Sequence, residues 1–172
     1  MSGATSLQWL NDRAQPHLII SAHDTGIWRL AYLPDGRRVV TGSGDRTVKV
    51  WNLESGEQEG TSMEHENEMA DVAVTQDGTK IISSDEHGNI KIWDVETHKL
   101  VEEWIHPEHW PKIAISPDDR LIAVGDQAVA IYTMEGRQVN DSAFGFGRGA
   151  VLSMSFSPDG DKLACGTDDE PM

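Results

Sequence analysis

Short stretches in which apolar and polar residues alternate, separated by tight-turn sequences, fill most of the chain. Val48 and Val50 alternate with polar neighbours, and Trp51 ends that stretch. A period of two residues is typical of a half-buried β-strand, and the Gly-Asp pair at 44–45 is typical of a tight turn. No stretch of the sequence has the periodicity of an amphipathic helix. The pattern therefore predicts an all-β fold made of short strands.

Three sequence markers repeat at a nearly fixed interval. Trp51 has one counterpart 42 residues later, Trp93, and another 42 residues earlier, Trp9. A turn of the Pro-Asp-Gly type recurs at intervals of 42, 41 and 41 residues, and its aspartates are Asp35, Asp77, Asp118 and Asp159. Twelve residues before these aspartates stand, in order, His23, His65, His106 and Gly147. A period of about 40–45 residues is typical of a propeller or a solenoid.

Together these markers resemble the WD-repeat β-propeller family, from about Leu7 to Asp169. The Trp-Asp pair that ends a repeat in that family stands here as Trp51-Asn52 and Trp93-Asp94, and as Tyr132-Thr133 in the third repeat. The resemblance implies blades of four antiparallel strands. In the first whole blade we expect these strands near residues 27–33, 37–42, 46–51 and 57–63.

A count of strands divides the chain, as one propeller region spanning 1–172, into three whole blades and two half-blades. The whole blades are predicted at 26–63, 68–104 and 109–142. Trp9 lies 14 residues before His23, as Trp51 does before His65, so we expect the segment 5–21 to supply the third and fourth strands of a blade. The segment 150–168 is expected to supply the first two strands. The two half-blades are therefore complementary.

Three ways of closing the ring fit this count. One chain could close on itself as four blades, which is the lower limit for propellers. Two chains could exchange halves in a two-fold ring of eight blades, which is a closed isologous assembly. Alternatively, the chain is a fragment of a longer protein. Four wide blades would crowd at the axis, so we expect a homodimer.

Four residues of the first repeat match the hydrogen-bonded tetrad of the family: His23, Thr41, Asp45 and Trp51. Their donors and acceptors can satisfy one another in a chain from indole to carboxylate. The second repeat keeps three of the four, His65, Ser83 and Trp93, with His87 in place of the aspartate. A catalytic role for His23 and Asp45 beside a hydroxyl is the alternative, and it would require both side chains to be exposed in a pocket. The resemblance implies a structural role.

Family resemblance also implies that partners bind the loops that lead into the innermost strands. The candidate partner-binding residues there are Asp24, Trp28, Arg29, Glu66, His109 and Arg148. Tryptophan and arginine are enriched in interaction hot spots. For Trp28, packing between blades and binding a partner remain open alternatives.

Composition narrows the classes of partner. The net charge of −15 disfavours nucleic acid and anionic membranes, because both need neutralising lysines and arginines. Residues 1–5 lack the charged start of a signal peptide, and no apolar run approaches the length of a membrane span. Cys165 is the single cysteine, so no disulfide framework is expected, and we predict a cytoplasmic protein.

No cofactor or metal site is expected from the sequence. His106 and His109, with Glu103 and Glu108 nearby, could bind zinc, but a pair of histidines on a loop lacks the preset ligand set of a zinc site. We therefore predict a non-enzymatic scaffold for protein–protein interaction, completed by homodimerisation. The alternatives are a fragment of a larger WD-repeat regulatory or signalling protein and a hydrolase that uses the His-Asp pair.

Overall fold

The computed structural model of the chain describes residues 5–10, 16–139, 144–145 and 149–168. The described residues form sixteen strands and no helix, so none of them makes a helical membrane span. The strands of the N-terminal part are β1 (Thr5–Leu10), β2 (Pro16–His23), β3 (Ile27–Tyr32), β4 (Arg38–Ser43), β5 (Thr47–Asn52) and β6 (Gln58–Glu64). The middle part holds β7 (Met69–Val74), β8 (Lys80–Asp85), β9 (Asn89–Asp94) and β10 (Leu100–Ile105). The C-terminal part holds β11 (Lys112–Ile115), β12 (Leu121–Gly125), β13 (Ala128–Thr133), β14 (Phe144–Gly145), β15 (Val151–Phe156) and β16 (Leu163–Thr167).

These strands make three four-stranded and two two-stranded antiparallel sheets. The four-stranded sheets are β3-β4-β5-β6, β7-β8-β9-β10 and β11-β12-β13-β14, each a simple meander in chain order. The two-stranded sheets are β1-β2 and β15-β16. The prediction of an all-β fold of the WD-repeat type is confirmed.

The outer-strand pairing of the third blade reaches beyond residue 142, where the sequence placed the end of that blade. Tyr132 and Gln138 form a bridge, and Val139 N donates to Ile131 O over 2.7 Å. In β14, Gly145 pairs with Ala128. The repeat period alone did not locate this pairing at Phe144–Gly145.

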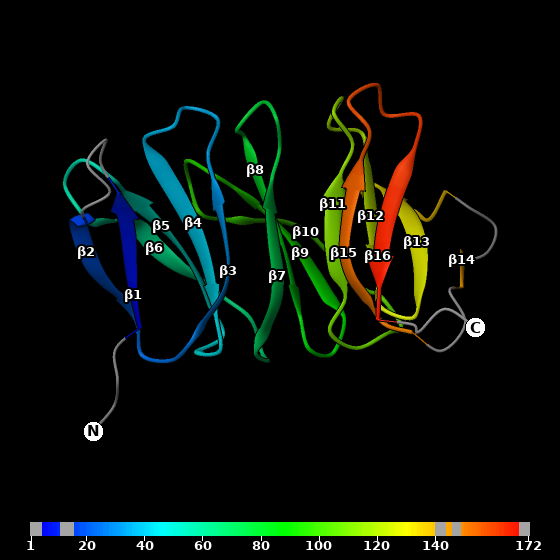
Figure 1. Ribbon diagram of the computed structural model, residues 1–172, viewed down its shortest axis with the longest axis horizontal. Helices are drawn as coiled ribbons and strands as arrows, with labels where there is room; N and C mark the ends of the chain where they lie inside the picture. Colours follow the sequence, from blue (N-terminus) through cyan, green and yellow to red (C-terminus); the bar gives the residue numbers. More distant parts are fainter. Residues whose placement is uncertain (1–4, 11–15, 140–143, 146–148, 169–172) are drawn as a thin grey trace.

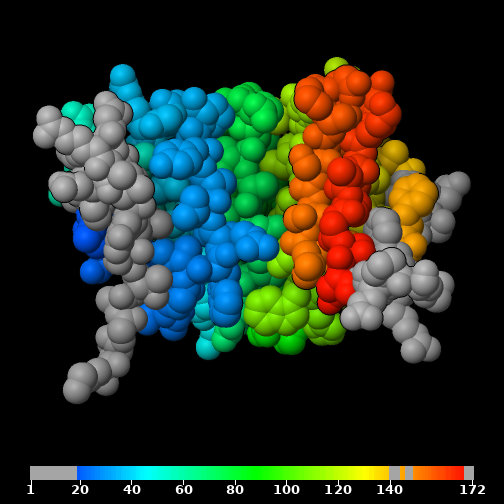
Figure 2. Space-filling view, in the orientation of Figure 1, coloured from blue at the N-terminus to red at the C-terminus, as the bar shows by residue number. Residues whose placement is uncertain are grey.

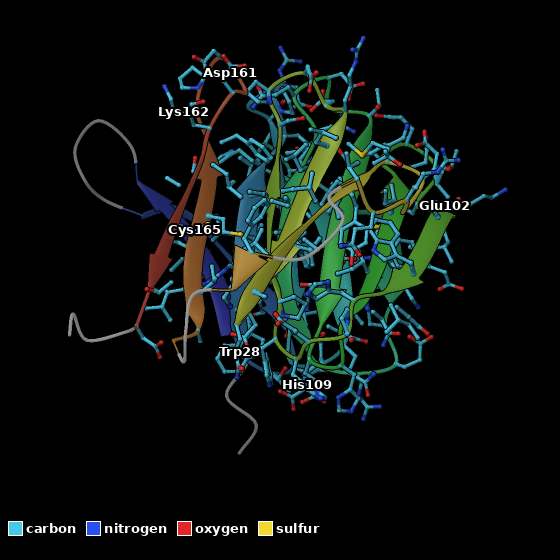
Figure 3. The ribbon with its side chains drawn as sticks, turned by 90° about the vertical axis from the view of Figure 1, so that its right-hand side faces the viewer. Trp28, Glu102, His109, Asp161, Lys162 and Cys165 are labelled. Atoms are coloured by element: carbon cyan, nitrogen blue, oxygen red, sulfur yellow. The ribbon has the colours of Figure 1, made fainter. Side chains whose placement is uncertain are left out.

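The sheets stand side by side as an arc (Figure 1). Contacts join β3 to β7, β7 to β11 and β11 to β15, which are the innermost strands of successive sheets. The sheets β1-β2 and β15-β16 lie at opposite ends of the long axis, and they lie on the same side of the molecule (Figure 3). The two half-blades thus form the two ends of an open arc.

The core lies between neighbouring sheets rather than inside any one of them. Val48 and Val50 of the first blade pack with Val72, Ile81 and Trp93 of the second. A second cluster, with Ile82 and Ile122 among its buried members, joins the second blade to the third, and smaller clusters join each half-blade to its neighbour. Alternating strand residues supply the two faces of each sheet, so each blade needs a blade on either side to bury both faces.

Candidate functional site

His23, Thr41, Asp45 and Trp51 form a continuous hydrogen-bonded chain that ties β2 to β4, to β5 and to the turn between them. Trp51 Nε1 donates to Thr41 Oγ1 over 2.9 Å, and Thr41 Oγ1 lies 2.6 Å from His23 Nε2. His23 Nδ1 lies 2.9 Å from Asp45 Oδ2. Because an indole can only donate and a carboxylate can only accept, the network assigns the Thr41 hydroxyl as the donor to Nε2 and Nδ1–H as the donor to Asp45.

Burial and hydrogen bonding set the protonation states of His23 and Asp45. Burial lowers the pKa of His23, and the hydrogen bond and charge of Asp45 oppose that shift without reversing it. Burial alone would raise the pKa of Asp45, but hydrogen bonds from Thr47 and His23 outweigh it and hold this pKa below its ordinary value. The side chain of His23 has no exposed surface. It therefore offers no base that a substrate could reach, and the arrangement links strands.

His65, Ser83 and Trp93 form an equivalent chain in the second blade. Trp93 Nε1 donates to Ser83 Oγ over 2.8 Å, and Ser83 Oγ lies 2.7 Å from His65 Nε2. The far side of this histidine faces Asp85, with 3.5 Å between Nδ1 and Oδ2. His87, which aligns with Asp45, lies exposed instead. A carboxylate two residues earlier in the chain, at the end of β8, thus takes the fourth position.

Asp85 is fully buried, and both oxygens of its carboxylate accept hydrogen bonds. Its Oδ1 accepts from the backbone N–H groups of His87 and Asn89, and its Oδ2 accepts from the side-chain amides of Asn67 and Asn89. Burial would raise the pKa of Asp85, but the interaction with His65 and the bonds from Asn89 and Asn67 outweigh it and hold the pKa far below its ordinary value. An alignment by strict period misses Asp85, although an aspartate that opens a turn containing an asparagine is a recognisable signal.

The third blade replaces the tetrad with a different set. Tyr132 stands where the other blades have tryptophan, and its hydroxyl lies 3.0 Å from His106 Nδ1. The other nitrogen, Nε2, faces Glu108 at 3.6 Å, so this ring is turned over relative to His23 and His65. Glu108 Oε2 also accepts from three successive backbone N–H groups of the β12–β13 turn, at Asp126, Gln127 and Ala128. Tyrosine reaches the histidine directly because Val124 supplies no hydroxyl.

One group of side chains has the spacing of a metal site: ligand atoms of His65, Glu66 and Asp85 lie within 4.8 Å of one another. Lys91 Nζ binds the Glu66 carboxylate at 3.0 Å, and Asp85 already accepts the four bonds described above. A cation would have to displace an ammonium and several donors. The geometry therefore fits an ion-paired structural cluster better than a metal centre.

An aromatic and cationic cleft lies on the face that carries the loops into the innermost strands. Trp28 and Trp110 are 52% and 40% exposed, and their rings meet edge to face with 6.4 Å between centroids. With Arg29, Ala70 and Lys112 they line a cleft of about 290 Å³. The sequence predicted Trp28 and Arg29 as binding residues. Trp110 and Lys112 belong to the third blade, and no sequence motif links them to the first blade.

The other predicted binding residues are scattered over the same face. Asp24 is exposed beside the first tetrad, and its backbone N–H lies 3.4 Å from Asp45 Oδ2. Glu66 is held by Lys91. His109 Nδ1 lies 3.0 Å from the Glu86 carbonyl, and Figure 3 shows it at the same end of the molecule as Trp28. Arg148 lies outside the described residues.

A second hollow lies beside β16 at the end of the arc. Its volume is about 540 Å³, and its apolar lining includes Val129 and Ile131 of β13 together with Leu163 and Cys165 of β16. Among the described strands, β16 pairs only with β15, so its other edge carries no ladder. In Figure 2, β15 and β16 are the neighbouring orange and red segments.

The chain was compared with known proteins and protein families. A model described as "WD domain, G-beta repeat" matches residues 14–52, 56–94 and 142–170, which together make up more than half of the chain. The chain belongs to the WD-repeat family. The unmatched stretch holds the WD repeat in which Val124 and Tyr132 depart from the pattern. WD repeats indicate a role as a protein-interaction scaffold.

Two WD-repeat relatives match short parts of the chain. The chicken protein named Denticleless protein homolog is 40% identical over 52 residues, which cover 30% of this chain and 7% of that protein. The Saccharomyces cerevisiae protein named U3 small nucleolar RNA-associated protein 12 is 54% identical over 35 residues, which cover 20% of this chain and 4% of that protein. The matches therefore span less than a tenth of the length of either relative.

Proposed function

We propose that the chain is a non-catalytic protein-interaction scaffold that completes its ring by pairing with a second copy of itself. One observation carries the proposal: among the described strands none pairs with the second edge of β16 beside an apolar hollow, while β1, the strand that the repeat pattern would place on that edge, pairs with β2 at the other end of the arc. Unpaired edges of this kind are templates for another strand.

The shape of the arc favours a two-fold ring. Both half-blades lie on the same side of the molecule and at opposite ends of its long axis (Figures 1 and 3), so the arc is open toward that side. A second copy, rotated by half a turn about the propeller axis, would bring β1 to the partner's β16 at both ends. Such a contact is isologous and closes.

The repeats set the register of the proposed pairing. In the first blade, Thr41 lies opposite Lys49 and Val40 lies opposite Val50. The turn markers map β4 onto β16, and the tryptophans map β5 onto β1. The equivalent register pairs Cys165 with Leu7, Ala164 with Gln8, and Leu163 with Trp9. All three pairs fall within the two strands as the structure defines them.

The exposed face of β3 supports the same assembly from the other end. Val72 of β7 packs on the blade before it, but its repeat equivalent, Leu30, is 52% exposed, and nearby Tyr32 on the same face is 55% exposed. The half-blade before β3 consists of β1 and β2, so within the described part of the chain no inner strands cover these side chains. A partner's β15 and β16 would supply those inner strands.

The class of partner and the compartment are part of the proposal. The charge of −15 and the scattered cations favour a protein partner over nucleic acid or a membrane. A single, partly buried cysteine fits the cytoplasm. The matched segments cover only a small part of each relative's length. This favours an alternative to the homodimer, in which the chain is part of a larger WD-repeat protein and other repeats complete the ring.

Light scattering during size-exclusion chromatography tests the proposal. Over a series of loading concentrations, we expect a species of twice the 19.0 kDa mass of one chain. A folded monomer at every concentration would contradict the homodimer and would favour completion by other repeats.

A further inference from the structure

The cleft between Trp28 and Trp110 has a chemistry that specifies its partner more closely. We propose that it binds a peptide segment carrying an acidic side chain next to an aromatic one, with the carboxylate at Lys112 and Arg29. The inference deepens the scaffold function proposed above and does not depend on the dimer, because one chain supplies the whole cleft.

Two half-exposed tryptophans in edge-to-face contact leave ring faces available to a third ring. Trp28 is the second residue of β3, the innermost strand of the first blade, and Trp110 lies just before β11, so the pair bridges the second blade. Aromatic side chains exposed at a concave surface are typical of binding hot spots. The volume of about 290 Å³ suits one or two side chains of a peptide rather than a folded surface.

The positively charged side chains of the cleft favour the binding of an anion. Arg29 Nε donates to Asp71 Oδ1 over 3.1 Å, and Asp71 Oδ2 accepts from the backbone N–H of Ile113. Asp71 thereby fixes the guanidinium and neutralises one positive charge. The ammonium of Lys112 makes no hydrogen bond or ion pair within the part of the chain that the structure describes, whereas the backbone of Lys112 pairs with Gly125 in the β11–β12 ladder. Burial and the charge of Arg29 lower the pKa of Lys112, and the weaker fields of Asp71 and Asp126 oppose that shift.

The lining cations Arg29 and Lys112, with Asp71 paired to Arg29, sum to one positive charge, and Asp126, which does not line the cleft, acts on Lys112 only through its field. That sum matches a single carboxylate, whereas recognition of a phosphate normally uses a cluster of arginines. In a chain of net charge −15, an unpaired cation that is half-buried beside two aromatic rings is a locally complementary site for an acidic segment.

Three matched pentapeptides test the inference: acetyl-Gly-Phe-Glu-Phe-Gly-amide, the same peptide with glutamine for glutamate, and the same peptide with phosphoserine. Binding is followed by the indole N–H resonances of the tryptophans, assigned with Trp28→Phe and Trp110→Phe. We expect the glutamate peptide to shift both resonances and to bind about tenfold more tightly than the glutamine peptide, as one charge-assisted bond predicts. Lys112→Met should remove that difference, and Lys99→Met, a change at an exposed lysine outside the cleft, should keep it.

Equal binding of the glutamate and glutamine peptides, or no shift of either indole up to about 5 mM peptide, a very weak affinity, would overturn the inference. Tighter binding of the phosphoserine peptide would overturn the assignment of a carboxylate. Neither result would bear on the mass of the assembly. Conversely, a monomer in light scattering would leave the cleft and its expected affinity unchanged.

Discussion

His65 and Asp85 face each other across the second blade with 3.5 Å between Nδ1 and Oδ2, and neither side chain has any exposed surface. In the first blade the corresponding pair, His23 and Asp45, lies at 2.9 Å. Asp45 lies in the middle of the β4–β5 turn, whereas Asp85 is the last residue of β8. The fold therefore requires a carboxylate beside the histidine but accepts it from more than one position in the sequence.

Removing the buried carboxylate should strongly destabilise the protein. Asp85→Ala leaves the donors of Asn67, Asn89 and the β8–β9 turn without an acceptor, and we expect a loss of about 2–4 kcal/mol in the free energy of unfolding. Urea denaturation followed by tryptophan fluorescence measures it. Glu57→Gln, at an exposed turn residue, is the control and should change the free energy by less than about 0.5 kcal/mol. Equal effects of the two substitutions would mean that Asp85 contributes nothing specific.

A second prediction concerns the hydroxyl group of Thr41 at the centre of the first tetrad. Thr41→Val keeps the shape of the side chain but leaves Trp51 Nε1 and His23 Nε2 without their shared partner. We expect a loss of about 1–3 kcal/mol, the cost of buried groups left unpaired. Thr61→Val, at an exposed position of β6, serves as the matched control. A Thr41→Val protein as stable as the parent would show that the hydrogen-bonded tetrad does not stabilise the blade.

Much of this fold follows from the sequence, and the exceptions share a physical cause. The period of the tryptophans and turn aspartates locates the blades, because each marker fills one fixed place in a sheet. The outer strand at Phe144–Gly145, by contrast, departs from the period. The roles of Asp85 and Glu108 beside the histidines were missed because hydrogen bonding needs an acceptor at a point in space, which residues of different register can reach. The pairing of Trp28 with Trp110 depends on the arc, which no local pattern encodes.

Stability should fall on mild acidification. Burial lowers the pKa values of His23 and His106 below the ordinary value of 6.5 in the folded protein. The unfolded chain therefore binds protons first, and folding free energy is lost as the pH falls through about 6.5. We expect unfolding free energies to decrease between about pH 7.5 and pH 5.5, by up to about 1.4 kcal/mol per pH unit for each histidine.

Urea titrations at several pH values in that window measure the slope. His106→Gln removes one of these two imidazoles and should make the slope shallower, whatever its effect on the stability at pH 7.5. A free energy that stays constant or rises on acidification would contradict the assignment of these histidines as buried and neutral.

The exposed face of β3 should be buried in the assembly. Tyr32→Glu places a charge where the proposal puts apolar contact with the partner's inner strands, and a charge buried without a partner is costly. We expect the dissociation constant of the dimer to rise at least about tenfold, as measured by sedimentation over a concentration series. Val101→Glu, at an equally exposed position on the outer strand β10, should leave the constant unchanged. Equal weakening by both would place the contact elsewhere.

The most direct test uses the native cysteine. In the proposed register Cys165 lies opposite residue 7 of a second copy, and opposed residues share a face of the sheet. Leu7→Cys should therefore yield a disulfide-linked dimer under mild oxidation, and Gln8→Cys, whose side chain would face the other side, should not. A disulfide formed within one chain, or equal cross-linking by both variants, would contradict the split ring.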